Sequence, residues 1–126
     1  MSQSCDLVQG KIELVLVCPV LSLKTFIEKI GEPKNNKAII ENLLKGFIYS
    51  YHLLNNDEKI EDLNDYQVVD FKNVYGVQYK LLRDMAAMSE IRYRLLPPYR
   101  EHLSQAFARY FMRVGLPQDI SVKGYY

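Results

Sequence analysis

The segment IELVLVCPV, at positions 12–20, constrains the fold more than any other part of this chain. Its side chains are almost all apolar and many are β-branched, a pattern typical of a strand that is buried on both faces. Pro19 has no amide hydrogen to donate to a sheet, so the strand should end there or run along a sheet edge. We therefore expect a sheet that is built around this strand.

Two helices are predicted directly after this strand. Ser22 is a suitable N-cap for the first, apolar residues recur at helical spacing behind it, and Gly31 suits its C-terminal end. The second covers residues 35–45, with apolar side chains on one face, and is closed by Gly46. Both helices are thus insertions that follow the first strand.

Period-two alternation replaces helical spacing in the next part of the chain. Residues 47–54 and 65–79 are predicted to be strands, the second with a bulge or bend at Gly76, and an acidic, turn-rich loop lies between them. Residues 80–89 are consistent with either a short helix or a connector. Residues 90–96 alternate again and predict a further strand.

The C-terminal part contains the clearest helical pattern, over residues 99–115. Pro97-Pro98 precede it, Glu101 lies near its start and Arg113 near its end, which suits the helix dipole. The apolar residues predicted to share one face are Tyr99, Leu103, Ala106, Phe107, Tyr110 and Val114. We expect this helix to pack across the sheet.

Together these segments predict an α+β fold in a single domain over residues 1–126. The architecture is expected to be a small, mostly antiparallel sheet or an SH3-like barrel with inserted helices and a C-terminal helix. Hydrophobic residues make up 48% of the chain and charged residues 25%, which excludes wholesale disorder. Without a membrane-length apolar run or a secretion signal, a cytoplasmic protein with no membrane partner is expected, and its two cysteines should be free thiols.

The arginines are the main signal for a binding surface. The net charge is only +1, yet all six arginines fall between Arg83 and Arg113. Arg92 and Arg94 would project from one strand face, while Arg109 would lie one helical turn before Arg113. With tyrosines interleaved, such a surface resembles those that bind RNA. The alternative is that the tyrosines belong to the core and the arginines are solvated or ion-paired.

The candidates for catalysis begin with the N-terminal pair Cys5-Asp6, which Ser4 precedes. A nucleophilic thiol needs a lowered pKa and a base within reach, usually a histidine. His52 and His102 are the histidines of the chain, and His102 is the one we retain as a candidate. The adjacent carboxylate would raise the pKa of the thiol instead. The sequence therefore favours a structural interpretation, in which the cysteine is buried and the aspartate caps a turn.

Acid–base chemistry could also involve a carboxylate. Asp70, Asp84 and Glu101 are the candidates, and Asp70 stands out because it lies inside the apolar run VVDF. Such a residue can be desolvated with a perturbed pKa, or it can pair with an arginine or cap a turn. No zinc-binding, phosphate-binding or dinucleotide-binding motif is present, so no metal and no cofactor is predicted.

Three stretches resemble an uncharacterised family of bacterial proteins. They are MSQSCDL with VLVCPV, then YQVVDFKNVYGV, then LLPPYREHLSQAFARYFMRVGLP. The family has an SQSCDL-type segment near a strand end and a similar Pro-Tyr-Arg-Glu-His helix. This resemblance implies that further strands precede the SQSCDL segment in relatives, so that the N-terminus here would be a shortened start. It implies no activity.

More distantly, the order of the strands and the terminal helix is similar to the small barrels of MazF/PemK-type toxins, which cut RNA. The basic, glycine-rich N-terminal strand and loop of those toxins have no counterpart here, and no catalytic residue transfers by motif. The resemblance therefore implies a barrel-like fold more than it implies ribonuclease activity.

The expected function is that of a small intracellular binding domain whose partner is RNA or another protein. An exposed strand edge at a short N-terminus would favour a homodimer. The alternative is a MazF-like endoribonuclease that uses Ser4, Asp6 and one or two arginines. Whether the chain is an enzyme is left open at this point.

Overall fold

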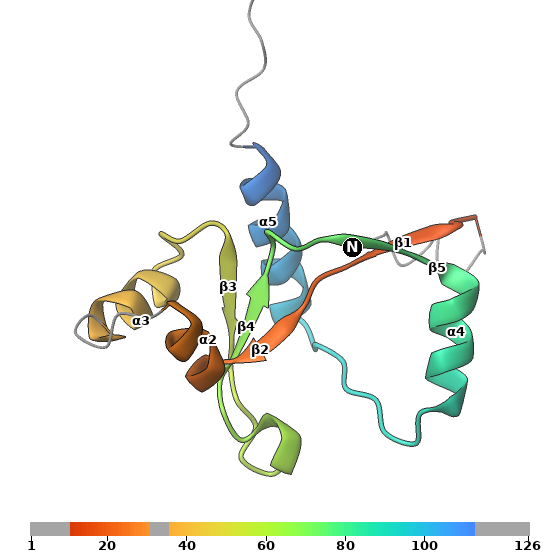
Figure 1. Cartoon of the computed structure of the whole chain (residues 1–126), viewed down its shortest axis with the longest axis horizontal. Coiled ribbons are helices and arrows are strands. Elements are labelled where there is room, and N and C mark those ends of the chain that lie inside the picture. Colours follow the sequence, from red (N-terminus) through yellow and green to blue (C-terminus); the bar gives the residue numbers. More distant parts are fainter. Residues whose placement is uncertain (1–10, 31–35, 113–126) are drawn as a thin grey trace, which may run out of the picture.

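The computed structural model describes residues 11–30 and 36–112. It contains helices and two small antiparallel sheets, which confirms the predicted α+β class (Figure 1). The strands are β1 (Leu14–Val17), β2 (Val20–Ser22), β3 (Tyr51–Leu54), β4 (Gln67–Asp70) and β5 (Tyr75–Gln78). The helices are α2 (Leu23–Ile30), α3 (Asn36–Leu44), α4 (Tyr79–Met88) and α5 (Tyr99–Met112), with a 3-10 turn, η2, at Glu61–Leu63.

The described strands form two separate sheets. One has the order β2-β4-β3, the other is the ribbon β1-β5, and all their pairings are antiparallel. These strands do not close into a barrel, so the open-sheet form of the expected architecture is the one observed. The ribbon and α4 extend away from the three-stranded sheet (Figure 1).

The predicted strand at 12–20 supplies both sheets. It is divided at Cys18 and Pro19, with β1 before them and β2 after them. Proline cannot donate a sheet hydrogen bond. Its carbonyl accepts one from the Asp70 amide at 3.0 Å, so Pro19 is still hydrogen-bonded to β4 at the point where the chain changes sheets. Burial of this strand on both faces is wrong for β1, where Leu14 is 58% exposed and Leu16 is 44% exposed.

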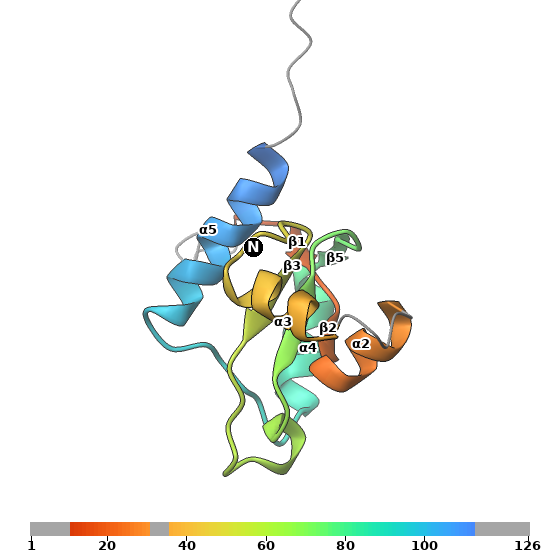
Figure 2. The ribbon, with the colours of Figure 1, turned by 90° about the vertical axis from the view of Figure 1, so that its left-hand side faces the viewer.

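The three-stranded sheet carries the core on one face. Val68 of the central strand β4 is completely buried and packs with Phe26 of α2 and Leu43 of α3. Because side chains alternate along a strand, the neighbouring Val69 and Phe71 point to the opposite face. There Phe71 meets two rings of α5, Phe107 at 5.5 Å and Tyr110 at 6.1 Å between ring centroids. The sheet thus lies between α2 and α3 on one side and α5 on the other (Figures 1 and 2).

Two of the predicted helix boundaries have the expected geometry. The Ser22 hydroxyl oxygen accepts a hydrogen bond from the Thr25 amide at 3.1 Å, as an N-cap does. Gly46 follows α3 with a φ of +67°, the left-handed conformation that ends many helices. At Gly76, by contrast, the predicted bulge is absent, since this residue pairs with Leu16 in an uninterrupted register.

The strand predicted over residues 90–96 is wrong. These residues connect α4 to α5 without forming a sheet ladder. Alternating side chains fit a strand only where a neighbouring strand supplies hydrogen-bond partners, and here Ile91 is 68% exposed. Of the two interpretations of residues 80–89, the helix is the one observed, as α4.

Candidate functional site

Two adjoining pockets lie where β3 meets α5 and the segment that leads into α5. The large pocket has a volume of about 490 Å³ and the small pocket about 240 Å³. His52 and His102 line both pockets, so the two imidazoles stand at the junction. We call the two pockets together the histidine groove.

The sheet places His52 in this groove. His52 is opposite Val69 in the antiparallel register, and paired residues share a face, so it lies on the face that α5 covers. Its ring stacks on Phe71 at 6.4 Å between centroids, and Phe71 is almost completely buried. The buried Phe71 ring therefore lies against one face of the imidazole.

Helix α5 supplies the opposite wall, and it packs against β3 (Figure 2). Tyr99, His102, Gln105 and Arg109 recur three or four residues apart and so form one stripe along the helix. The neighbouring stripe faces the core through half-buried Leu103, Ala106, Phe107 and Tyr110, as predicted, whereas Tyr99, predicted on the same face, is exposed. Packing of the core stripe thus turns the polar stripe toward the groove.

The groove is cationic. Arg94 lines the large pocket and Arg109 lines the small one. No Asp or Glu of the described residues lines either pocket. Glu101 is adjacent to His102 in sequence, but its carboxylate pairs with Arg100 at 2.8 Å. The local charge is therefore positive even though the chain as a whole is nearly neutral.

Arg109 also has a structural neighbour. One terminal nitrogen of its guanidinium is 3.9 Å from where a Cβ atom on Gly46 would lie, beside the C-terminus of α3. Helix C-termini attract cations, and the last turn of α3 has no basic residue of its own. Arg109 thus lies near the C-terminal end of α3, where the helix dipole is favourable to a cation.

His52 has a pKa below the ordinary histidine value. The main cause is desolvation by burial, and electrostatic repulsion by His102 adds to it. At neutral pH His52 is therefore a neutral imidazole, with one ring nitrogen able to donate a hydrogen bond and the other able to accept one.

The structure brings together only some of the residues that the sequence singles out. His102, Arg94 and Arg109 converge on the groove. Arg92 lines none of the pockets described here; without the predicted strand, it does not share a face with Arg94. Candidates Ser4, Cys5, Asp6 and Arg113 lie outside the described residues.

From the sequence, His52 is considered as a base for Cys5, whereas Asn55 and Asn56, which line the large pocket, are not singled out. The signal for His52 was available. It lies in the alternating segment 47–54, and in the structure it shares a sheet face with Val69. The asparagines follow the end of β3 and carried no comparable signal.

Asp70 has the structural role that was one of its two interpretations. It is buried, and its carboxylate accepts hydrogen bonds from the Lys72 amide at 2.8 Å and from the Asn73 side-chain amide at 2.7 Å. These bonds close the turn between β4 and β5. The third carboxylate candidate, Asp84, lies 4.0 Å from Arg83 on the surface.

Cys18 is a free thiol, and partial burial is the main cause that raises its pKa, with the Asp70 carboxylate adding to the effect. A raised pKa lowers the thiolate fraction and with it the reactivity. Within the described residues, no three His, Cys, Asp or Glu side chains are grouped so that they could hold a metal ion.

Comparisons with protein-family models, with curated proteins and with solved structures give no match for this chain. None of the helices in the described part of the chain is both long enough and apolar enough to cross a membrane.

Proposed function

We propose that this chain is a binding domain whose histidine groove takes single-stranded nucleic acid, with RNA as the ligand. The observation that carries the proposal is the lining of the groove: two arginines, two histidines and several tyrosines, with no carboxylate among the described lining residues. Phosphates are attracted by such a lining, and flat bases stack on its rings.

The aromatic rings are accessible to a ligand. Tyr66 is 41% exposed and Tyr99 is 52% exposed, and both line the large pocket. Tyrosines that only complete a core would be buried. The sequence left open whether Tyr99 belongs to the core, and its exposure favours a role in stacking.

The arginines are also available for phosphate. Within residues 11–30 and 36–112, ion pairs join only Arg83 to Asp84 and Arg100 to Glu101. Arg94 and Arg109 are therefore not neutralised by carboxylates of this part of the chain. Cations without a carboxylate partner in a groove are what a phosphate backbone requires.

Fluorescence anisotropy with a labelled single-stranded oligoribonucleotide, measured over a series of salt concentrations, tests this proposal. For single strands the logarithm of affinity falls with the logarithm of salt concentration by roughly 0.7 per phosphate contact. Arg109→Gln and Arg94→Gln should each weaken binding and each reduce that slope by roughly 0.7.

Arg83→Gln is the matched control, because Arg83 is exposed on α4 and lines neither pocket. It should leave affinity and slope unchanged. Equal effects of all three substitutions, or an unchanged slope in the two groove variants, would contradict the proposal.

The endoribonuclease alternative remains a separate proposal, since Ser4 and Asp6 lie outside the described residues. The same oligoribonucleotide distinguishes RNA cleavage from RNA binding alone. Gel analysis of the bound RNA after long incubation should show intact strands if the domain only binds, and shorter products if it cleaves.

A further inference from the structure

The two pockets of the histidine groove differ in chemistry. The large pocket is mostly apolar, lined by leucines and tyrosines together with two asparagines, the two histidines and Arg94. The small pocket has a larger polar share, with Arg109, Gln105 and the two imidazoles. A ligand that fills both must have a flat, largely apolar part and an anionic part.

The large pocket has the features of a base site. Its volume of about 490 Å³ lies within the range of pockets that hold small organic ligands. Tyr66 and Tyr99 offer partly exposed ring faces for stacking. Leucine side chains of β3 and of the segment before α5 supply apolar contact.

Asn56 adds hydrogen-bonding capacity at this site. Its side-chain amide donates to the Asn64 carbonyl at 3.3 Å, which orients the amide group. An oriented amide has both a donor and an acceptor, as the edge of a nucleobase does. Asn55, next to it, is exposed and lines the same pocket.

The small pocket has the features of a phosphate site. Arg109 is the cation that lines it, and its planar guanidinium can donate two parallel hydrogen bonds to a phosphate. Gln105 precedes Arg109 by one helical turn and brings a further amide donor to the same pocket. No carboxylate of the described residues competes there.

The histidines stand where the two pockets meet. A ligand that extends from one pocket to the other must therefore pass the two imidazoles. Their ring nitrogens can bond the oxygens of a sugar or of its phosphate ester.

From this division we infer that the unit recognised by the groove is a nucleoside monophosphate, with its base in the large pocket and its phosphate beside Arg109 in the small pocket. The inference rests on the proposed function and makes it specific: one nucleotide of a strand carries the recognition, and the free mononucleotide competes for the same site.

Competition against the labelled oligoribonucleotide tests this assignment, with three unlabelled probes: AMP, adenosine and inorganic phosphate. AMP should compete at concentrations at least roughly tenfold below those needed for adenosine or phosphate, because only AMP fills both pockets. Arg109→Gln should weaken the binding of AMP about tenfold or more and leave the binding of adenosine unchanged.

Tyr99→Ala should have the complementary effect: it should weaken the binding of AMP and of adenosine and leave the binding of phosphate unchanged. Arg109→Lys serves as the second phosphate-site variant. It keeps the charge but loses the planar guanidinium, so its affinity for AMP should lie between those of the wild type and of Arg109→Gln. Thermal melting of each variant shows whether it is folded.

The possible failures can be told apart. RNA binding that AMP displaces no better than phosphate does would overturn the inference and leave the proposed function standing. An RNA that does not bind, together with AMP that does not bind directly in calorimetry, would overturn both. AMP that binds directly while RNA does not would contradict the proposed function but support the pocket assignment.

Discussion

Asp70 is the buried carboxylate that fixes the turn between β4 and β5. Replacement by Ala leaves the Lys72 amide and the Asn73 side chain without their acceptor. Loss of such bonds at a buried site costs about 1–3 kcal/mol. We therefore expect Asp70→Ala to lower the free energy of unfolding by that amount, measured by urea denaturation.

Asp84→Ala is the control for Asp70. The Asp84 carboxylate lies on the surface at 4.0 Å from Arg83, and exposed pairs contribute less than about 1 kcal/mol. A cost for Asp84→Ala as large as that for Asp70→Ala would contradict the assigned role of Asp70.

His52 makes stability depend on pH. Burial lowers its pKa in the folded protein, so between that value and the ordinary histidine pKa the unfolded chain binds more protons. The stability linked to His52 is complete above the ordinary pKa and is lost as pH falls through the lowered one. Urea midpoints should therefore drop as the pH falls from neutral through the ordinary histidine pKa.

His52→Gln should flatten that pH dependence even if it changes the overall stability. The other charged groups around His52, namely His102, Arg94 and Arg109, are still present in this variant. An equally steep pH dependence in His52→Gln would show that another group is responsible.

At the scale of elements, Gly46 is the residue that α3 requires at its end. Its φ of +67° lies in the left-handed region, where a Cβ costs about 1–2 kcal/mol. Gly46→Ala should lower the free energy of unfolding by that amount. The new methyl group would lie 3.9 Å from the Arg109 guanidinium, an ordinary contact distance, so the cost comes from the backbone conformation.

Gly76→Ala is the matched glycine control, since Gly76 has no left-handed φ and its added methyl group would meet Leu14 at an ordinary 3.9 Å. In a regular strand, alanine should be neutral or stabilising by about 0.5 kcal/mol. Equal destabilisation by both substitutions, measured by urea denaturation, would contradict the conformational argument for Gly46.

How far the elements follow from the sequence depends on whether their signals are local. The Ser22 cap, the Gly46 end and the core stripe of α5 depend on short spacings, and all three were predicted. The division of 12–20 between two sheets depends on which strands pair, which no local pattern specifies. The strand prediction for residues 90–96 was wrong for the same reason: the alternation is local, but no neighbouring strand pairs with this segment.

The same reasoning applies to the candidate site. Arg109 and Gln105 share a helix stripe, so their common face could be predicted. That Arg94 joins them while Arg92 does not is decided by the path of the chain into α5. The meeting of His52 with His102 is a contact between β3 and α5, which requires the tertiary fold.

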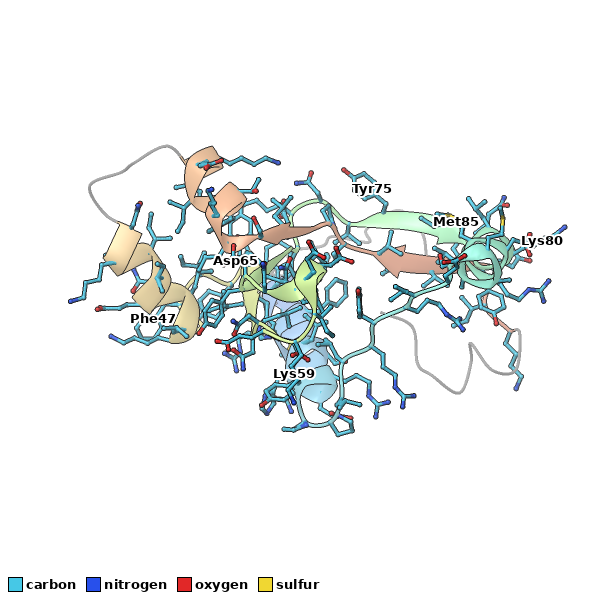
Figure 3. The ribbon with its side chains drawn as sticks, turned by 90° about the horizontal axis from the view of Figure 1, so that it is seen from below. Phe47, Lys59, Asp65, Tyr75, Lys80 and Met85 are labelled. Carbon is cyan, nitrogen blue, oxygen red and sulfur yellow. The ribbon has the colours of Figure 1, made fainter. Side chains whose placement is uncertain are left out.

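At the scale of the whole molecule, the two sheets differ in burial. The three-stranded sheet has helices on both faces, whereas the β1-β5 ribbon leaves Leu14 and Tyr75 more than half exposed; Figure 3 shows Tyr75 and Met85 on this part of the molecule. Two-stranded ribbons with little burial open easily. Hydrogen exchange should therefore be at least roughly tenfold faster in β1 and β5 than in β4.

The predicted homodimer can be examined in the same experiment. Exchange measured at low and at high protein concentration should become slower in the ribbon alone if two copies associate there. Uniform exchange rates across both sheets at low concentration would contradict the difference in stability that we assign to them.

The most direct test of the histidine groove uses the fact that the chain has two histidines, and that both line it. NMR of the imidazole resonances, during titration with an unlabelled single-stranded oligoribonucleotide, reports on the groove without any substitution. We predict that the signals of His52 and His102 shift together and saturate at one concentration of RNA. Imidazole signals that stay in place while RNA binds would contradict the account, because the RNA would then occupy another surface.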